Sequence, residues 1–150
     1  MRHNPLLIVA GILSTVAAVL HLAVIAGGPA WYRFFGAGEQ MARLAEQGHW
    51  YPAVVTTGIA TILLTWAAYA FSGAGLLPRM PLLRTGLVVI STIYLLRGLV
   101  LIPAMVTNPA GPAGLTAFTW CSSLIVLVYG LAYAIGTWRA WPDLAPRRSL

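Results

Sequence analysis

"VVTTGIATILLTWAAYAF", residues 54–71, is an apolar run of sequence that contains no charged side chain. About 20 such residues are enough for a helix to cross the hydrocarbon core of a bilayer. The run does not alternate between apolar and polar residues, as a strand of a membrane barrel would. Because backbone groups inside lipid must be hydrogen-bonded within the protein, the run predicts a transmembrane helix.

Similar runs recur along the chain, which has 150 residues, 59% of them hydrophobic and only 8% charged. This composition lies outside the range of soluble globular proteins. We expect four spans, over residues 6–26, 52–71, 82–103 and 115–138. The first run exceeds the ~7–15 apolar residues of a secretory signal, so we interpret it as a retained span. The predicted fold is all-α, a single transmembrane domain over residues 1–150 built as an antiparallel four-helix bundle.

The formal net charge of +6 comes from nine basic residues, all arginines, against three acidic ones. Most arginines flank the predicted spans at one set of ends: Arg2, Arg79, Arg84, Arg139, Arg147 and Arg148. The connection "VTNPAGPAG", residues 106–114, carries no charge. Basic residues accumulate on the cytoplasmic side of membrane proteins, so both termini are expected in the cytoplasm. This explanation of the charge predicts no nucleic-acid partner.

The connection between the first two predicted spans is long and polar. "HLAVIAGGPAWYRFFGAGEQMARLAEQGHW", residues 21–50, holds both glutamates and two of the three histidines of the chain. The first helix is expected to end at Gly27-Gly28-Pro29, because two glycines and a proline disfavour helix continuation. Long ordered connections tend to be functional or to hold structure of their own.

A short amphipathic helix is predicted within this connection, over "EQMARLAEQ", residues 39–47. The apolar Met41, Leu44 and Ala45 fall on one side, and the charged residues on the other, and Gly48 follows in a typical helix-terminating position. The aromatic residues around it are Trp31, Tyr32, Phe34, Phe35, Trp50 and Tyr51. Such residues gather at the membrane–water interface, where we expect this helix to lie.

Arg97 is the most informative polar residue, because a charge at the centre of a span costs about 2.5–3.5 kcal/mol on insertion scales. Its side chain can snorkel to a lipid phosphate of the outer leaflet. Alternatively, it pairs with Glu39 or Glu46, of which we favour Glu39, since a bidentate arginine–carboxylate pair satisfies both groups. A third possibility is an anionic ligand held by Arg97.

His21 lies inside the first predicted span, where an ionisable residue is a functional hypothesis by default. The alternative is a neutral imidazole satisfied by one neighbouring hydroxyl or carbonyl group. By depth alone, one level is expected to hold His21, Arg97, Tyr94, Thr119 and Cys121. We therefore predict a polar pocket that opens toward the outer leaflet, with Arg97, Glu39, His21, Tyr94 and Glu46 as ligand-binding residues and His21 as the candidate catalytic group.

Metal and cysteine chemistry receive little support. Glu46 and His49 have the E-x-x-H spacing of di-iron bundles, but the motif occurs once and Gly48 interrupts it, so neither a metal nor another cofactor is expected. The single cysteine, Cys121, excludes an internal disulfide and is interpreted as a small packing residue.

Small and hydroxylated residues at helical spacing predict close helix contacts. Thr57, Thr61 and Thr65 form one such row, and Gly130 with Ala134 forms a small-xxx-small step. In membranes, residues of this kind let helices approach and share hydrogen bonds.

"WYRFFGAGE", residues 31–39, and "IYLLRG", residues 93–98, resemble signatures of small bacterial four-span inner-membrane proteins of unknown function. The resemblance covers most of the chain and implies a membrane location but no reaction. The leading functional hypothesis is binding of a lipid or small amphipathic ligand in the outer-leaflet pocket. The alternatives are a membrane enzyme acting on a lipid-soluble substrate, with His21 as acid–base group, and a scaffold or accessory subunit. The expected partners are membrane lipids, further copies of the chain or other membrane proteins.

Overall fold

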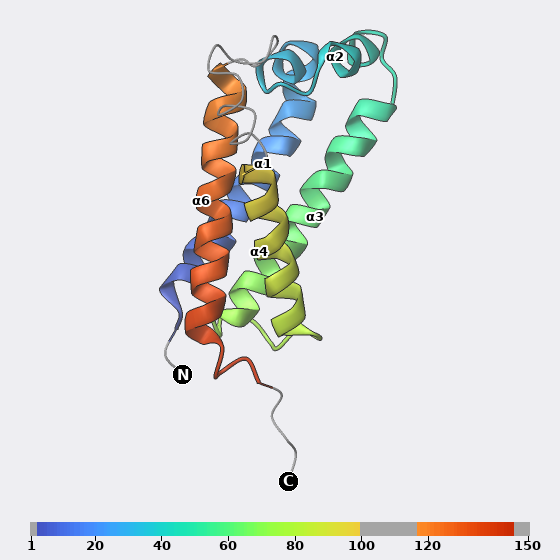
Figure 1. Cartoon of the computed structure of the whole chain (residues 1–150). Helices are drawn as coiled ribbons and strands as arrows, with labels where there is room; N and C mark the ends of the chain where they lie inside the picture. The colour runs from blue at the N-terminus through green and yellow to red at the C-terminus, as the bar shows by residue number, and fades with distance from the viewer. Residues whose placement is uncertain (1–2, 100–116, 146–150) are drawn as a thin grey trace. The chain divides into compact units, whose positions relative to one another are not determined.

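The computed structural model describes residues 3–99 and 117–145. Within them the protein is all-helical and has no strand (Figure 1), which confirms the predicted class. The helices are α1 (Pro5–Phe34), α2 (Glu39–Glu46), α3 (Tyr51–Gly73), α4 (Leu83–Leu99) and α6 (Ala117–Ala140). Residues 100–103 and 115–116 of the predicted spans, and the uncharged connection between them, lie outside the described residues.

Three of the described helices are long and apolar enough to cross a membrane, not four. They are α1, α3 and the part of α6 from Trp120 to Ala140. The described part of α4 has 17 residues and falls short of a span. Only 28% of the most apolar window of each candidate span is buried inside the protein. Most of this apolar surface therefore faces outward, as lipid-facing helices require.

The first helical stretch is interrupted where its end was predicted, but a second stretch follows it within α1. At Gly28 the backbone leaves the helical region, with φ 67° and ψ −156°, but the chain resumes a helix and continues to Phe34. A φ of this sign favours glycine, so Gly28 allows the break. Pro29 then begins the next helical stretch, where its missing N–H is no loss. The Gly-Gly-Pro sequence thus interrupts the helix as predicted, and the helical stretch from Pro29 to Phe34 was not predicted.

The chain divides into two compact units. The first unit comprises residues 1–13 and 66–150, and the second comprises residues 14–65. The first unit contains the start of α1, the end of α3, and α4 and α6. The second contains the rest of α1, α2 and the start of α3.

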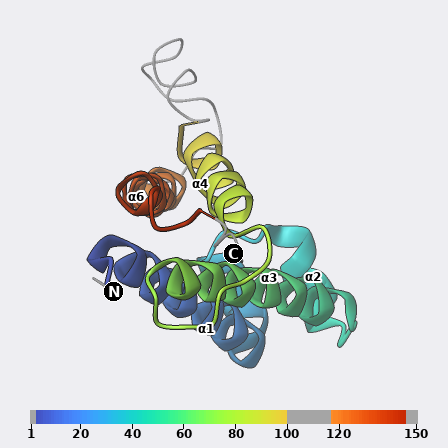
Figure 2. The ribbon, with the colours of Figure 1, turned by 90° about the horizontal axis from the view of Figure 1, so that it is seen from below.

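In the first unit, α4 and α6 lie side by side (Figure 2). Glycines bring the two backbones together: a Cβ added at Gly98 would lie 2.8 Å from the Leu127 Cα, and one at Gly130 would lie 2.9 Å from the Leu95 backbone nitrogen. The close approach predicted for Gly130 is confirmed. The physical reason is that only a hydrogen fits between the helices at these positions.

The start of α1 packs at one end of the same unit. Leu7 is fully buried, and its side chain lies 3.0 Å from where a Cβ would stand at Gly73 on α3 and at Gly136 on α6. Asn4 begins α1 by accepting hydrogen bonds from the backbone N–H groups of Leu6 and Leu7. Its side-chain amide donates to the Gly136 carbonyl oxygen at 2.8 Å. The first residues of α1 are thereby attached to the last turns of α6.

The threonine row on α3 forms different contacts from those expected. Thr57, Thr61 and Thr65 are exposed, and each hydroxyl donates to the backbone carbonyl four residues earlier, at 2.7–2.9 Å. A threonine hydroxyl reaches the preceding turn of its own helix easily. The prediction of hydrogen bonds to a neighbouring helix is therefore wrong for these hydroxyls.

The amphipathic helix is confirmed as α2, and it ends as predicted. Gly48 adopts φ 68° and its N–H donates to the Ala45 carbonyl oxygen at 3.1 Å. The apolar side of α2 forms a small core in the second unit, in which Ala42 is buried together with Val24 and Tyr32 of α1. Met41 and Ala45 pack against this core. The buried side of α2 thus holds it against the kinked end of α1.

Candidate functional site

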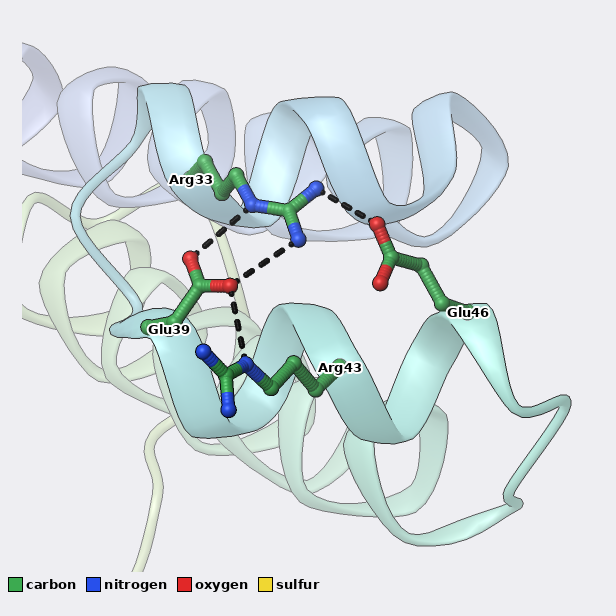
Figure 3. Close-up of polar contacts among 4 residues, drawn as sticks. All are labelled: Arg33, Glu39, Arg43 and Glu46. Carbon is green, nitrogen blue, oxygen red and sulfur yellow. Dashed lines mark hydrogen bonds and ion pairs between the residues drawn. The ribbon is translucent and has the colours of Figure 1, made fainter.

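Four charged residues of the second unit form an ion-pair network between α1 and α2 (Figure 3). Arg33 Nε lies 2.9 Å from Glu39 Oε2, and Arg33 Nη1 lies 2.7 Å from Glu46 Oε1. Arg43 Nε reaches Glu39 Oε1 at 3.1 Å from the next turn of the same helix. Figure 3 shows the Arg33 guanidinium between the two carboxylates. The network neutralises all four charges and fastens α2 to the end of α1.

This network changes the titration of Glu39. Hydrogen bonds from Arg33, and secondly from Arg43, lower the pKa of the Glu39 carboxyl from 4.5 to about 2. A carboxyl whose pKa is lower in the folded state stabilises the fold above its unfolded pKa and loses that effect as the pH falls through its folded pKa. The stabilising effect of Glu39 is therefore complete above about pH 4.5 and is lost toward pH 2.

Replacing Glu39 with glutamine is expected to flatten the acid side of the stability profile. The wild-type thermal midpoint should fall between pH 5 and pH 2 by more than that of Glu39→Gln, because the variant has no carboxylate to protonate at this position. Thermal unfolding in detergent, followed by circular dichroism, measures the difference. Asp143→Asn is the control, since Asp143 forms no ion pair among the described residues. Equal acid sensitivity of wild type and Glu39→Gln would contradict the assignment.

A cavity of about 280 Å³ lies beside α2 in the second unit, and we name it the α2 cavity. Ile25, Gly28, Pro29 and Tyr32 of α1 line one side. The other side consists of Ala45, Gly48, His49, Trp50, Pro52 and Ala53, from the end of α2 to the start of α3. The kink at Gly28 and the turn at Gly48, both with positive φ, therefore border the same space.

The side chains that line the α2 cavity are mostly apolar, and the polar ones among the described residues are His49 and Tyr32. His49 Nδ1 accepts the backbone N–H of Tyr51 at 3.1 Å, which leaves the ring proton on Nε2 as a donor. The His49 ring stacks on Trp50, with centroids 5.5 Å apart. The Tyr32 phenol oxygen accepts the hydroxyl of Thr56 at 3.3 Å.

Glu39 and Glu46, predicted to belong to the ligand pocket, belong instead to the ion-pair network, and the α2 cavity is lined by neither. His21 Nδ1 lies 2.7 Å from the Ala17 carbonyl oxygen, one turn earlier in α1, so the imidazole carries its proton on Nδ1 and is satisfied locally. The proposed acid–base role of His21 stays a prediction.

Arg97 is exposed near the end of α4, and its Nη1 donates to the hydroxyl of Ser123 on α6 at 3.4 Å. Ser123 is buried, with 4% of its surface exposed. None of the ion pairs among the described residues involves Arg97. Its pairing with Glu39, its contact with a lipid phosphate and its binding of an anionic ligand all stay predictions.

Tyr94 is buried and belongs to an aromatic cluster in the first unit. Its ring lies 4.9 Å from Trp66, 5.6 Å from Tyr129 and 5.4 Å from Tyr133, centroid to centroid. Tyr133 is fully buried and its hydroxyl donates to the Trp66 carbonyl oxygen at 3.0 Å. The cluster gives Tyr94 a packing role, and its predicted role in ligand binding is untested.

The residues considered for cysteine and metal chemistry are Cys121, Glu46 and His49. Cys121 is exposed on α6, so its interpretation as a packing residue is wrong. Glu46 contacts Arg33, and His49 accepts the Tyr51 N–H. Among the described residues, no three histidine, cysteine, aspartate or glutamate side chains gather as a metal site would need.

The residues that line the α2 cavity were identified in the sequence only in part. His49 was considered as a metal ligand and Trp50 as an interfacial aromatic, but Gly28 and Tyr32 were not connected with them. The available signal was the glycine and proline residues before and after α2, Gly28 with Pro29 and Gly48 with Pro52, because these residue types mark departures from regular backbone. Sequence spacing does not show that two such departures face each other.

The fold and the site define a class: a small all-helical protein with three described helices long and apolar enough to cross a membrane, and with an apolar cavity at the level of a short amphipathic helix. Comparison with protein families, with curated proteins and with solved structures found no match for this chain.

Proposed function

We propose that the protein is a four-span protein of the bacterial inner membrane that binds a small amphipathic molecule, such as a single-chain lipid, in the α2 cavity. The observation that carries the proposal is the composition of this cavity. About 280 Å³ of space is bordered by apolar and aromatic groups and by one imidazole donor. Ligand sites commonly combine apolar walls with a small number of placed polar groups, and this volume lies near the lower end of their range.

The aromatic residues around α2 support a position at the membrane interface. Phe34, Trp50 and Tyr51 are exposed beside the cavity, with 72%, 64% and 45% of their surface accessible. Aromatic side chains of this kind anchor proteins at headgroup level. A ligand that enters here would leave its apolar part among the cavity walls and its polar end beside the His49 donor. The chemistry fits an acceptor such as a carbonyl, carboxylate or phosphate oxygen.

The sequence of α4 supports the fourth span and the proposed orientation. Residues 100–102, directly after the described helix, are Val-Leu-Ile, so the apolar run reaches the length needed to cross a bilayer. The bond from Asn4 to Gly136 joins the start of α1 to the end of α6, which supports placing both termini on the same side. The excess of arginines near these ends favours the cytoplasm.

The exposed guanidinium of Arg97 supports a contact with a lipid phosphate, separate from the ligand of the α2 cavity. Its guanidinium is exposed on an apolar helix, and its hydrogen bond to Ser123 leaves the charge unbalanced by any carboxylate of the described residues. A charged group in this position is stabilised by a phosphate at the interface, which a long side chain can reach.

Native mass spectrometry of the protein, extracted gently from its own membrane, tests the proposal. We expect the wild type to retain a lipid-sized mass and Ala53→Phe to lose most of it, because the larger side chain fills the α2 cavity. Val54→Phe is the matched control, since the neighbouring Val54 is 55% exposed and does not line the cavity. Arg97→Gln is expected to retain the mass.

Two outcomes would contradict the proposal. A wild type that carries no retained mass, and takes up none when a lysophospholipid is added, has no such site. A mass that is lost in Arg97→Gln but kept in Ala53→Phe would move the binding site from the α2 cavity to Arg97.

A further inference from the structure

The first unit has a second and larger cavity at the end where α1 begins and α6 ends. Its volume is about 1040 Å³, and we name it the arginine cavity. Two arginines line it, Arg79 from the connection between α3 and α4 and Arg139 from the last turn of α6. His3 and Asp143 lie on its wall, and apolar surface comes from Leu77 and Leu83.

Most polar groups around the arginine cavity already have partners within the protein. The Ser72 hydroxyl donates to the Pro78 carbonyl oxygen and accepts the Met80 N–H, which shapes the connection that carries Arg79. The carbonyl oxygen of Ala140, at the end of α6, accepts the N–H groups of Asp143 and Leu144. The helix ends therefore offer few free backbone groups to a ligand.

A third arginine, Arg84, already contacts another residue of the protein. Arg84 Nη2 donates to the Trp141 carbonyl oxygen, and the guanidinium carbon lies 4.6 Å from the centre of the Trp141 ring. Arg79 and Arg139, in contrast, are exposed and take part in no ion pair among the described residues. Among the described residues that line the cavity, two arginines without an ion pair thus stand against the one carboxylate of Asp143.

We propose that the arginine cavity binds the phosphate headgroup of an anionic phospholipid, on the side of the membrane at which α1 begins and α6 ends. Guanidinium groups match phosphate oxygens in geometry and charge, and can bind two oxygens at once. Basic pockets between the ends of membrane helices are suited to anionic headgroups. The helix ends of α1, α3 and α6 place the cavity where headgroups lie, and its volume holds a headgroup with its glycerol.

The test uses the full chain in a neutral detergent with short-chain dioctanoyl phosphatidylglycerol as the probe and dioctanoyl phosphatidylcholine as the zwitterionic reference. Native mass spectrometry counts the bound lipids over a titration. Each basic residue near an anionic headgroup contributes ~1 kcal/mol, or about 5-fold in affinity. We therefore expect Arg79→Gln and Arg139→Gln each to weaken phosphatidylglycerol binding about 5-fold, and the double variant about 30-fold.

Two controls separate a headgroup site from a change in folding. Arg43→Gln removes an exposed arginine from the second unit and should leave phosphatidylglycerol binding unchanged. Asp143→Asn removes the opposing charge from the cavity wall and should strengthen binding, a change of opposite sign that damage to the fold would not produce. Both arginines of the cavity are exposed, so their replacement removes no buried packing.

The result that would overturn the proposal is a double variant that still prefers phosphatidylglycerol over phosphatidylcholine to the same extent as the wild type. Inorganic phosphate, added at matched ionic strength, identifies the source of the bound group. If phosphate alone displaces the lipid with the same dependence on Arg79 and Arg139, the site is one for free phosphate and the lipid proposal fails. Ala53→Phe should not alter this binding, so failure of the α2 cavity proposal remains distinguishable.

Discussion

Gly98→Ala is expected to lower the stability of the protein by about 1–3 kcal/mol, the usual cost of overpacking a close contact. The added methyl group would lie 2.8 Å from both the Cα and the backbone nitrogen of Leu127. If the neighbouring atoms belonged to a flexible side chain, that side chain could rotate away from the methyl group. They belong to the backbone of α6, which cannot move in this way. The two helices would have to separate along their shared face, which loses van der Waals contact that membrane helices depend on. Thermal unfolding in detergent at constant lipid content measures the change.

Gly58→Ala is the matched control, since Gly58 is also inside a helix and a Cβ added there would meet nothing within 4 Å. Alanine favours helix over glycine by roughly 0.5–1 kcal/mol, so this variant should be as stable as the wild type or more stable. The two substitutions are chemically identical, but Gly98→Ala is expected to lower the stability of the protein and Gly58→Ala is not. Equal effects of the two variants would show that Gly98 does not separate the backbones of α4 and α6.

Leu7→Ala is expected to have the largest effect of the substitutions considered, a loss of about 2–5 kcal/mol. Leu7 is fully buried, and its side chain fills the space that the glycines leave open on α3 and α6. Removing it leaves a void that helices already in close contact cannot fill. Since Leu7 joins the start of α1 to the helix ends around the arginine cavity, lipid binding there should weaken with stability.

Leu22→Ala on the same helix is the control for Leu7→Ala. Leu22 is 44% exposed, so the same substitution there removes outward-facing surface and leaves no internal void. We expect a change of less than about 1 kcal/mol, as is usual for exposed positions. A comparable loss of thermal stability in both variants would contradict the packing role of Leu7. The measurement is the one used for Gly98→Ala.

The candidate sites were only partly accessible to sequence reasoning. The charge of Arg97 inside an apolar run was apparent, but its contact with Ser123 joins positions 26 residues apart. Glu39 was expected to leave its own segment for Arg97, whereas Arg33, six residues away, and Arg43, one helical turn away, are its partners. Arg33 and Arg43 are close to Glu39 in sequence. Pairing with them therefore costs less chain entropy than pairing with a distant arginine.

Local sequence was sufficient to predict that the chain is helical, that it has long apolar helices and where the short helix α2 lies. Hydropathy, helix period and the glycine after α2 act over a few residues, so their effects can be read in order along the chain. Other features depended on how distant segments meet. These are the continuation of α1 past Gly28, the contact of α4 with α6 at Gly98, and the two cavities. Their formation depends on backbone angles and on which faces come together, and one pattern of residues is compatible with several such arrangements.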